Sequence, residues 1–158
     1  MATIVRLKNV VHAGALVLLL PALCSCSFFD PKIVKVCEAV LQQRLRSPSG
    51  YERIEIVSSE TKMDREAFSK HVGRIDLPTS YFTSKMQAFD SGRLRPMVFT
   101  LLISYDAPNA YGTPVRGIAS CEYVGSYTDD SHASEYTVSL DGQTQTQWLI
   151  ERIKAASN

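Results

Sequence analysis

The reactive chemistry of this sequence lies mainly in its cysteines. The 158-residue chain contains Cys24, Cys26, Cys37 and Cys121. A thiol can be alkylated, can form a disulfide or can bind a metal ion, and its surroundings decide which of these occurs. Cys24 and Cys26 end an apolar run and stand one residue apart, whereas Cys37 and Cys121 lie in segments with the hydrophobic pattern of helices and strands. The two pairs therefore predict different chemistry.

The apolar run before Cys26 has the organisation of an export signal. Arg6 and Lys8 provide a positive flank, and residues 10–23 are apolar with His12 as the main interruption. About 20 apolar residues are needed to span a bilayer as a helix. The run is short for a permanent anchor and suits the hydrophobic region of a signal peptide. The alternative is a buried N-terminal helix of a cytosolic protein, but the order of flank, apolar core and small-residue exit favours the signal.

Residues 23–26, Leu-Cys-Ser-Cys, resemble the lipobox of bacterial lipoproteins, in which an aliphatic and two small residues precede the modified cysteine. The resemblance implies that residues 1–25 are a signal peptide and that Cys26 carries the lipid as the new N-terminus. Modification of Cys24 stays open, although that frame would place the bulky Leu23 directly before the cut. Ser27 implies, by the same resemblance, transfer to the outer membrane in an organism with two membranes, where Asp would favour the inner one.

A lipid on Cys26 would hold the protein to a membrane without a spanning helix. Each buried methylene contributes about 0.8 kcal/mol and one acyl chain binds only marginally, so the firm anchor would come from the two or three chains that the resemblance implies. Residues 26–30 would form a short tether and residues 31–158 a single domain. The expected location is the cell envelope, facing the periplasm, with the outer membrane favoured over the inner one.

Export would leave one pair of cysteines free to react. With Cys24 removed and Cys26 lipidated, Cys37 and Cys121 remain in an oxidising compartment, which predicts a disulfide between them. The alternative is two buried free thiols that pack as small apolar side chains. No Cys-x-x-Cys sequence and no pair of histidines lies near either cysteine, so the spacing does not favour a metal site. The sequence predicts no cofactor.

Sequence motifs of enzymes are missing from the chain. It contains no Gly-x-Ser-x-Gly, no His-Glu-x-x-His and no glycine-rich nucleotide-binding pattern, which argues against an enzyme. His12 would leave with the signal. His71 falls at the apolar spacing of a short helix, which favours a partly buried structural residue over a ligand. His132 ends the segment Thr-Asp-Asp-Ser-His, residues 128–132, which could bind a cation but is more typical of a polar loop.

Composition and charge are those of a globular domain. Apolar residues make up 45% and charged residues 21% of the chain, and 17 basic residues nearly balance 16 acidic ones. Loss of Arg6 and Lys8 with the signal would leave the remainder close to neutral. Nucleic-acid-binding proteins usually carry a basic surplus, so nucleic acid is not an expected partner. The length suits one domain.

The hydrophobic pattern predicts an α+β fold: an N-terminal helix, an antiparallel β-meander of about four strands and a C-terminal helix. Asp30 is the expected N-cap before Pro31, and an apolar stripe that includes Cys37 continues until residues 47–50 stop the helix. β-forming residues predict strands at 51–60, 96–107, 115–125 and 134–142, and a short helix is expected at 63–72. Residues 73–95 show no clear period and are expected to be irregular, with one short strand near Tyr81.

The C-terminal helix is expected over residues 143–156. Thr144 and Gln147 have the spacing of a capping box, with Asp141 as an alternative cap. Four apolar residues are expected to pack this helix onto the sheet: Trp148, Leu149, Ile150 and Ile153.

The turn between the two central strands carries the remaining candidate binding residues. Asn109 and Gly112 tolerate the positive φ that a tight connection needs. Asp106 can accept backbone N–H groups, and Arg116 is placed to pair with it across the turn. A structural role is favoured for this set. The alternative is a ligand site in which Arg116 and Tyr111 face an acidic partner.

The same segment resembles a group of small bacterial and phage-borne proteins with no established activity. Their pattern is a helix ending in Ser-Pro-Ser or Ser-Pro-Thr, then a strand, an Asp-Ala-x-Asn-aromatic-Gly turn, and an arginine in the returning strand. The matching residues are Ser47, Pro48, Ser49, Asp106, Ala107, Asn109, Tyr111, Gly112 and Arg116. Pro108 and the spacing of Ala110 and Tyr111 depart from the pattern. The resemblance implies a one-domain α+β envelope module without catalytic residues.

These features predict a lipid-anchored envelope protein that acts as a binding or structural module, with the membrane and an envelope protein as its partners. The alternative is an accessory lipoprotein of a secretion, conjugation or phage-related system, which depends on the analogy with mobile-element proteins. A small hydrolase is the weakest of the three because no catalytic motif supports it.

Overall fold

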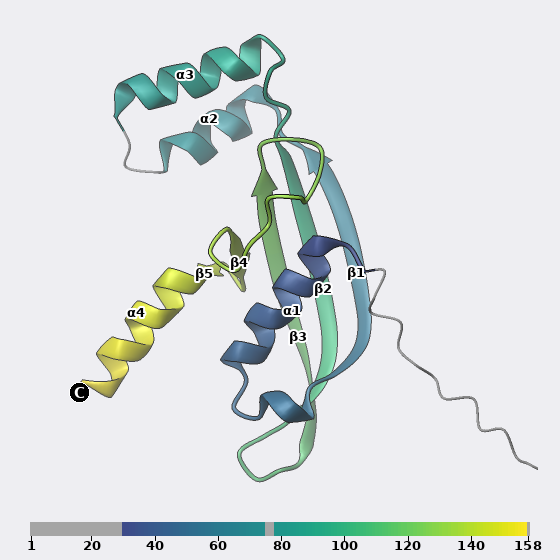
Figure 1. Cartoon of the computed structure of the whole chain (residues 1–158). Helices are drawn as coiled ribbons and strands as arrows, with labels where there is room; N and C mark the ends of the chain where they lie inside the picture. The colour runs from purple at the N-terminus through teal and green to yellow at the C-terminus, as the bar shows by residue number, and fades with distance from the viewer. Residues whose placement is uncertain (1–29, 75–77, 158) are drawn as a thin grey trace, which may run out of the picture.

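The computed structural model describes residues 30–74 and 78–157 and has an α+β fold (Figure 1). The predicted signal peptide, the lipobox and most of the predicted tether lie outside the described residues. The elements are α1 (Lys32–Arg44), the 3-10 helix η2 (Pro48–Gly50), β1 (Glu52–Lys62), α2 (Arg65–Gly73), α3 (Thr79–Asp90), β2 (Met97–Pro108), β3 (Pro114–Gly125), β4 (Val138–Leu140), β5 (Gln143–Thr144) and α4 (Gln145–Ala156). No helix in this part of the chain is both long enough and apolar enough to cross a membrane.

The strands form one antiparallel sheet in the order β1-β2-β3-β4-β5. The three long strands make up most of this sheet, and β1 lies at its edge. The expectation of four strands was one short, because the two residues of β5 pair with β4. The expected strand at 134–142 contributes only Val138–Leu140, since Ser134 and Thr137 form a hydrogen-bonded turn before it.

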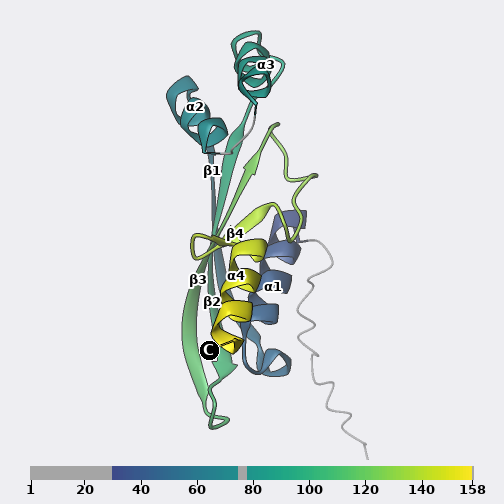
Figure 2. The same ribbon diagram turned by 90° about the vertical axis from the view of Figure 1, so that its left-hand side faces the viewer.

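One face of the sheet carries the main core. Alternating residues of β2 and β3 point to this face and are almost completely buried, among them Leu101, Ile103 and Ala119. Figure 2 shows α1 and α4 together on this side of the sheet. Residues that alternate with the core set stay accessible on the other face, where Leu102 and Ile118 are exposed. The sheet is therefore covered mainly from one side, by α1.

The predicted disulfide is present. Cys37 of α1 and Cys121 of β3 are bonded, with their Cα atoms 6.0 Å apart and a sequence separation of 84. Both residues are fully buried in the core. The expected stripe of α1 supplies this contact, because Ile33, Val40 and Leu41 lie on the same buried side as Cys37.

The start of α1 differs from the prediction. Pro31 and not Asp30 is the N-cap residue, and no neighbouring side chain caps the helix. The carboxylate of Asp130 instead accepts a hydrogen bond from the Ile33 N–H at 2.7 Å. An anionic group at this end also interacts favourably with the helix dipole. Asp30 points elsewhere and forms an ion pair with Arg53.

Along the chain, two helices connect β1 to β2. The helix predicted at 63–72 is α2, and its N-cap is Asp64, whose side chain accepts the N–H of Ala67. The prediction of an irregular segment over 73–95 with a strand near Tyr81 was wrong, because α3 occupies most of it. Apolar residues of both helices form a second, smaller core at the end of the sheet, built on Phe68, Val72 and Met86 with Phe82 and Phe89 packed beside them.

The C-terminal helix is capped as predicted but packed differently. Thr144 and Gln147 form the capping box, while Asp141 accepts the Ser120 N–H instead. The expected packing of α4 onto the sheet was wrong for Leu149, Ile150 and Ile153, which are exposed. The guanidinium groups of Arg44 and Arg152 each lie over the ring of Trp148. The first turn makes the main attachment, where buried Gln145 donates to Gln43.

Removing the disulfide is expected to destabilise the domain strongly. The chain-entropy model gives about 4–5 kcal/mol for a loop of this length, as an upper value. The variant Cys37→Ala/Cys121→Ala should therefore unfold at a clearly lower urea concentration than the oxidised protein, measured by circular dichroism. Reduced wild-type protein is the matched control and should behave like the variant. Equal urea midpoints for the oxidised protein and the variant would contradict the prediction.

Candidate binding groove

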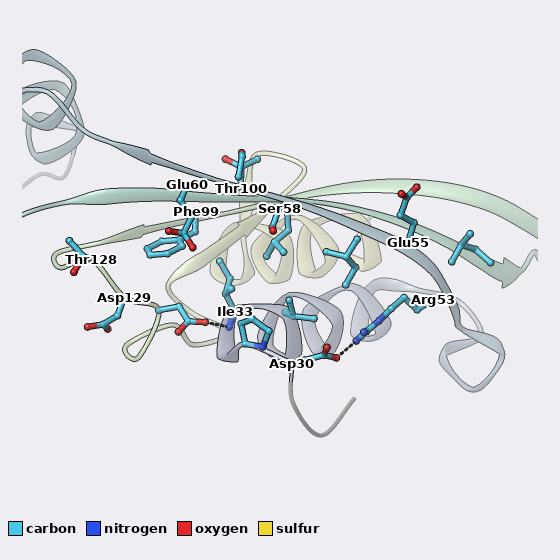
Figure 3. A pocket seen from close by; sticks show the side chains of 17 residues that line it. Asp30, Ile33, Arg53, Glu55, Ser58, Glu60, Phe99, Thr100, Thr128 and Asp129 are labelled. Atoms are coloured by element: carbon cyan, nitrogen blue, oxygen red, sulfur yellow. Dashed lines mark hydrogen bonds and ion pairs between the residues drawn. The ribbon is translucent and has the colours of Figure 1, made fainter. Parts of the chain in front are cut away.

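A groove runs between the edge strand β1 and the N-terminal half of α1 (Figure 3). Its volume is about 520 Å³. Apolar side chains from three elements line its inner part: Ile33 and Val34 of α1, Ile56 of β1, and Phe99 and Leu101 of β2. Residues 128–130, in the loop after β3, close one end. The groove is therefore a place where the main core reaches the surface.

The charged residues around this groove are mostly acidic. They are Asp30, Glu55, Glu60, Asp129 and Asp130, with Arg53 as the basic member of the lining. Glu60 pairs with Phe99 on the core side of the sheet and points into the groove, whereas Glu55 pairs with Ser104 and points to the opposite side (Figure 3). Hydrogen bonds from the side chain and backbone of Ser131 hold the pKa of Asp129 below its usual value. Glu60 and Asp129 thus place two acidic side chains at one end of the groove, and Lys62 follows Glu60 on the same face of β1.

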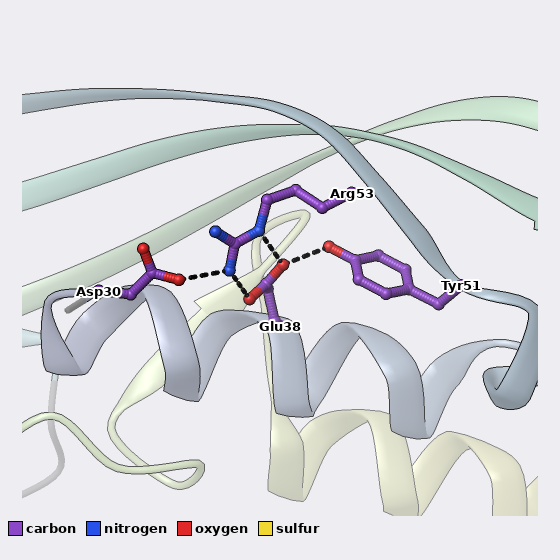
Figure 4. A network of polar contacts seen from close by, with 4 residues as sticks. All are labelled: Asp30, Glu38, Tyr51 and Arg53. Atoms are coloured by element: carbon purple, nitrogen blue, oxygen red, sulfur yellow. Dashed lines mark hydrogen bonds and ion pairs between the residues drawn. The ribbon is translucent and has the colours of Figure 1, made fainter. Parts of the chain in front are cut away.

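Arg53 anchors a polar network at the other end of the groove (Figure 4). Its Nε donates to Glu38 at 2.6 Å, and its Nη2 donates to Asp30 at 2.7 Å and also to Glu38. The Tyr51 hydroxyl donates to the same Glu38 carboxylate at 2.6 Å. The network joins β1 to α1 and to Asp30, two residues before this helix, so it fixes the spacing of the two walls.

The protonation of this network follows from its contacts. Hydrogen bonds to Glu38 and then to Asp30 raise the pKa of Arg53, so the guanidinium stays charged. Burial, and next the hydrogen bond to the Glu38 carboxylate, raises the pKa of Tyr51, so its hydroxyl keeps its proton. Arg53 is surrounded by two carboxylates, and its charge is balanced within the protein.

The outer edge of β1 presents backbone groups that pair with no other strand in the described part of the chain. The Met63 N–H donates to the Pro96 carbonyl at 3.0 Å, directly beyond the paired residues Lys62 and Met97. Bonded and non-bonded pairs alternate in an antiparallel ladder. The backbone groups of residues 55, 57, 59 and 61 therefore face β2, and those of residues 56, 58, 60 and 62 face outward along the groove.

The hairpin residues singled out by the sequence lie at the tip that joins β2 and β3. Arg116 donates to both carboxylate oxygens of Asp106 at 3.0 Å, and this pair holds the pKa of Asp106 below its usual value. Asn109 accepts the N–H groups of Tyr111 and Thr113 with its side-chain oxygen. Gly112 has a φ of 80°. The predicted Asp106–Arg116 pair is thus confirmed, and Tyr111 is exposed beside it.

The histidines and acids near them form no metal centre in residues 30–74 and 78–157. His71 is partly buried, as predicted. Burial, and next the charge of Arg74, lowers the pKa of His71, against an opposing effect of Glu122. The aspartates of segment 128–132 serve the loop and α1: Asp130 accepts the Ile33 N–H, and Asp129 accepts from Ser131.

The groove was not identified as a site in the sequence. Its residues come from segments separated by up to about a hundred positions, and Asp30 was expected to cap α1. The run of β-forming residues in β1 was visible, but its edge position was not. No protein-family model, no curated protein and no solved structure matches the chain. The function is therefore inferred from the chemistry of the groove and of the cysteines.

Removing the charge of Arg53 is expected to cost more stability than removing that of a surface arginine. Arg53→Met would leave the largely buried Glu38 carboxylate, only 12% exposed, without its cation. Breaking a buried pair from one side costs 3–5 kcal/mol, and we expect about 2 kcal/mol because Arg53 is partly exposed. Arg65→Met is the matched control, because its pair with Asp90 is exposed to solvent and should contribute little to stability. Urea unfolding measures both, and equal losses would contradict the prediction.

Proposed function

We propose that the protein is a lipid-anchored protein of the cell envelope and that its domain is a binding module for another envelope protein. The lipobox-like residues 23–26 after an apolar run support lipidation at Cys26. The Cys37–Cys121 disulfide supports an exported protein, because such bonds persist in oxidising compartments. Ser27 favours the outer membrane over the inner one, by resemblance to known lipoproteins.

The main support for a binding function is that the groove lies close in sequence to the proposed lipid anchor. Asp30 lines the groove and follows Cys26 by only four positions. An extended chain spans at most about 3.3–3.6 Å per residue, so a lipid on Cys26 would keep Asp30 within roughly 14 Å of the anchored residue. A partner at the membrane surface could then reach the groove.

The chemistry of the groove favours binding over catalysis. Asp30 and Glu38 are ion-paired with Arg53, and Asp130 accepts the helix N–H of Ile33. These acids thus serve the structure, and the apolar inner part offers area for contact. An accessory lipoprotein of a secretion, conjugation or phage-related system is the second candidate and would use the same groove. A small hydrolase is the weakest proposal.

Lipidation is tested by substitution at each cysteine of the lipobox. Cys26→Ser should abolish labelling by a fatty-acid analogue in cells and should release the protein from the membrane fraction. Cys24→Ser is the matched control and should keep both. If Cys24→Ser alone abolishes labelling, the lipid is on Cys24. If both variants are labelled like the wild type, the lipid-anchor proposal fails.

The binding function is tested by photo-crosslinking on intact cells. A photoreactive residue at Thr128, in the groove lining, should give a discrete crosslinked product with another envelope protein. The same residue at Tyr111, exposed at the hairpin tip, is the control for position. A product from Tyr111 and none from Thr128 would move the binding site to the hairpin and contradict the groove.

A further inference from the structure

The edge of β1 is suited to pair with another strand. The outward-facing backbone groups of residues 56, 58, 60 and 62 have the spacing of a template for strand addition. Proteins usually blunt such edges with bulges, prolines or charged side chains, and Glu60 and Lys62 are the charged residues of this stretch. The bulge of β1 lies at its Arg53–Glu55 end, and residues 56–62 are regular and contain no Pro or Gly.

The groove continues this edge on the core side of the sheet. In an antiparallel sheet, two residues that lie opposite each other on neighbouring strands have their side chains on the same face of the sheet. A segment bonded to Ile56, Ser58 and Glu60 would therefore direct every second side chain over the groove. Ser58 is small and stands between Ile56 and Glu60, so it leaves room above the apolar inner part. An apolar side chain fits opposite Ser58.

The charges of the groove decide which side chain of the bound segment is favoured opposite Glu60. Glu60 and Asp129 are the acidic side chains at one end, with Lys62 two positions beyond Glu60 on the same face of β1, while Arg53 is balanced by Asp30 and Glu38. A lysine or arginine opposite Glu60 would therefore be favoured there, and an acidic residue would be repelled.

We propose that β1 binds an extended segment of a partner protein as an added strand, with a basic side chain opposite Glu60 and apolar side chains opposite Ser58 and Ile56. The proposal rests on the binding part of the proposed function and does not depend on the lipid. It specifies the class of partner: a polypeptide with an exposed, extended stretch in which every second residue is apolar or basic.

A second copy of β1 matches this edge less well. Suppose that two copies of β1 pair antiparallel through the outward-facing backbone groups of residues 56, 58, 60 and 62, and overlap over most of residues 56–62. Glu60 of one copy then lies opposite Ile56, Ser58 or Glu60 of the other. None of these residues supplies the positive charge. A different polypeptide is therefore the occupant that the charges favour.

The test uses the purified chain and the acetylated, amidated peptide Thr-Lys-Thr-Val-Thr-Val-Thr, whose order suits antiparallel addition with Lys opposite Glu60. The matched peptide carries Glu in place of Lys. We expect the Lys peptide to bind at least ~10-fold more tightly, because a like charge would face Glu60 in the other complex. Titration followed by NMR measures both affinities. The Glu60→Lys variant should reverse the preference, and Glu55→Lys, with the same charge change on the opposite side, should keep it.

Backbone pairing is tested separately from charge. N-methylation of the peptide at Lys and Val, whose N–H groups would face β1, should abolish binding, while N-methylation at the intervening Thr residues should leave it. Amide hydrogen exchange of Ile56, Ser58 and Glu60 should slow on binding, and that of Val57 and Ser59 should change little.

The proposal is overturned if neither peptide binds, if both bind equally, if Glu55→Lys acts like Glu60→Lys, or if the chain pairs with itself and already protects these amides. A groove crosslink in cells together with failure of the peptides would leave the binding module intact and reject strand addition. Peptide binding without a groove crosslink in cells would support strand addition and reject the proposed envelope-protein partner of the groove.

Discussion

The packing of α1 against one face of the sheet is the contact on which the rest of the structure depends. The buried side of α1 supplies Ile33, Cys37 and Val40 to the main core, and the Cys37–Cys121 bond ties its middle to β3. Without α1, the inner residues of β2 and β3 would be exposed to water. The same helix forms one wall of the groove, so the site is a by-product of how the sheet is covered. The same core contacts that hold α1 on the sheet therefore also fix the position of this wall of the groove.

Features with local signals were predictable from the sequence. The apolar stripe of α1 predicted a buried face, and the spacing of Thr144 and Gln147 predicted a capping box that the structure contains. The long central strands and their turn followed from β-forming residues and from Asn109 and Gly112. The disulfide was predictable because export would leave a single pair of cysteines. Each of these predictions depended on residues close in sequence or, for the disulfide, on the number of cysteines left after export.

Features decided by distant residues were not predictable. Asp130 caps α1 from 97 positions away and leaves Asp30 to pair with Arg53. No local sequence pattern indicates that Asp130 would take the capping role expected of Asp30. α3 was missed because Thr, Ser, Tyr and Phe are weak helix formers, and its stripe of Phe82, Met86 and Phe89 acquires meaning only against α2. For α4, an apolar face was visible, but where that face would point was not.

The core is closed unequally on its two sides, and this links the fold to the proposed site. On the β4 side, Val138 and Leu140 are buried and Arg44 of α1 donates to the Leu140 carbonyl. On the β1 side, Ile56 remains partly exposed above an open groove. Burial of apolar surface is favourable wherever a complementary chain is available. An added strand would continue the sheet and complete this cover, while the Arg53 network already holds β1 and α1 at a fixed separation. Pre-organised walls reduce the entropy lost on binding, so the same contacts that stabilise the domain would also favour the partner.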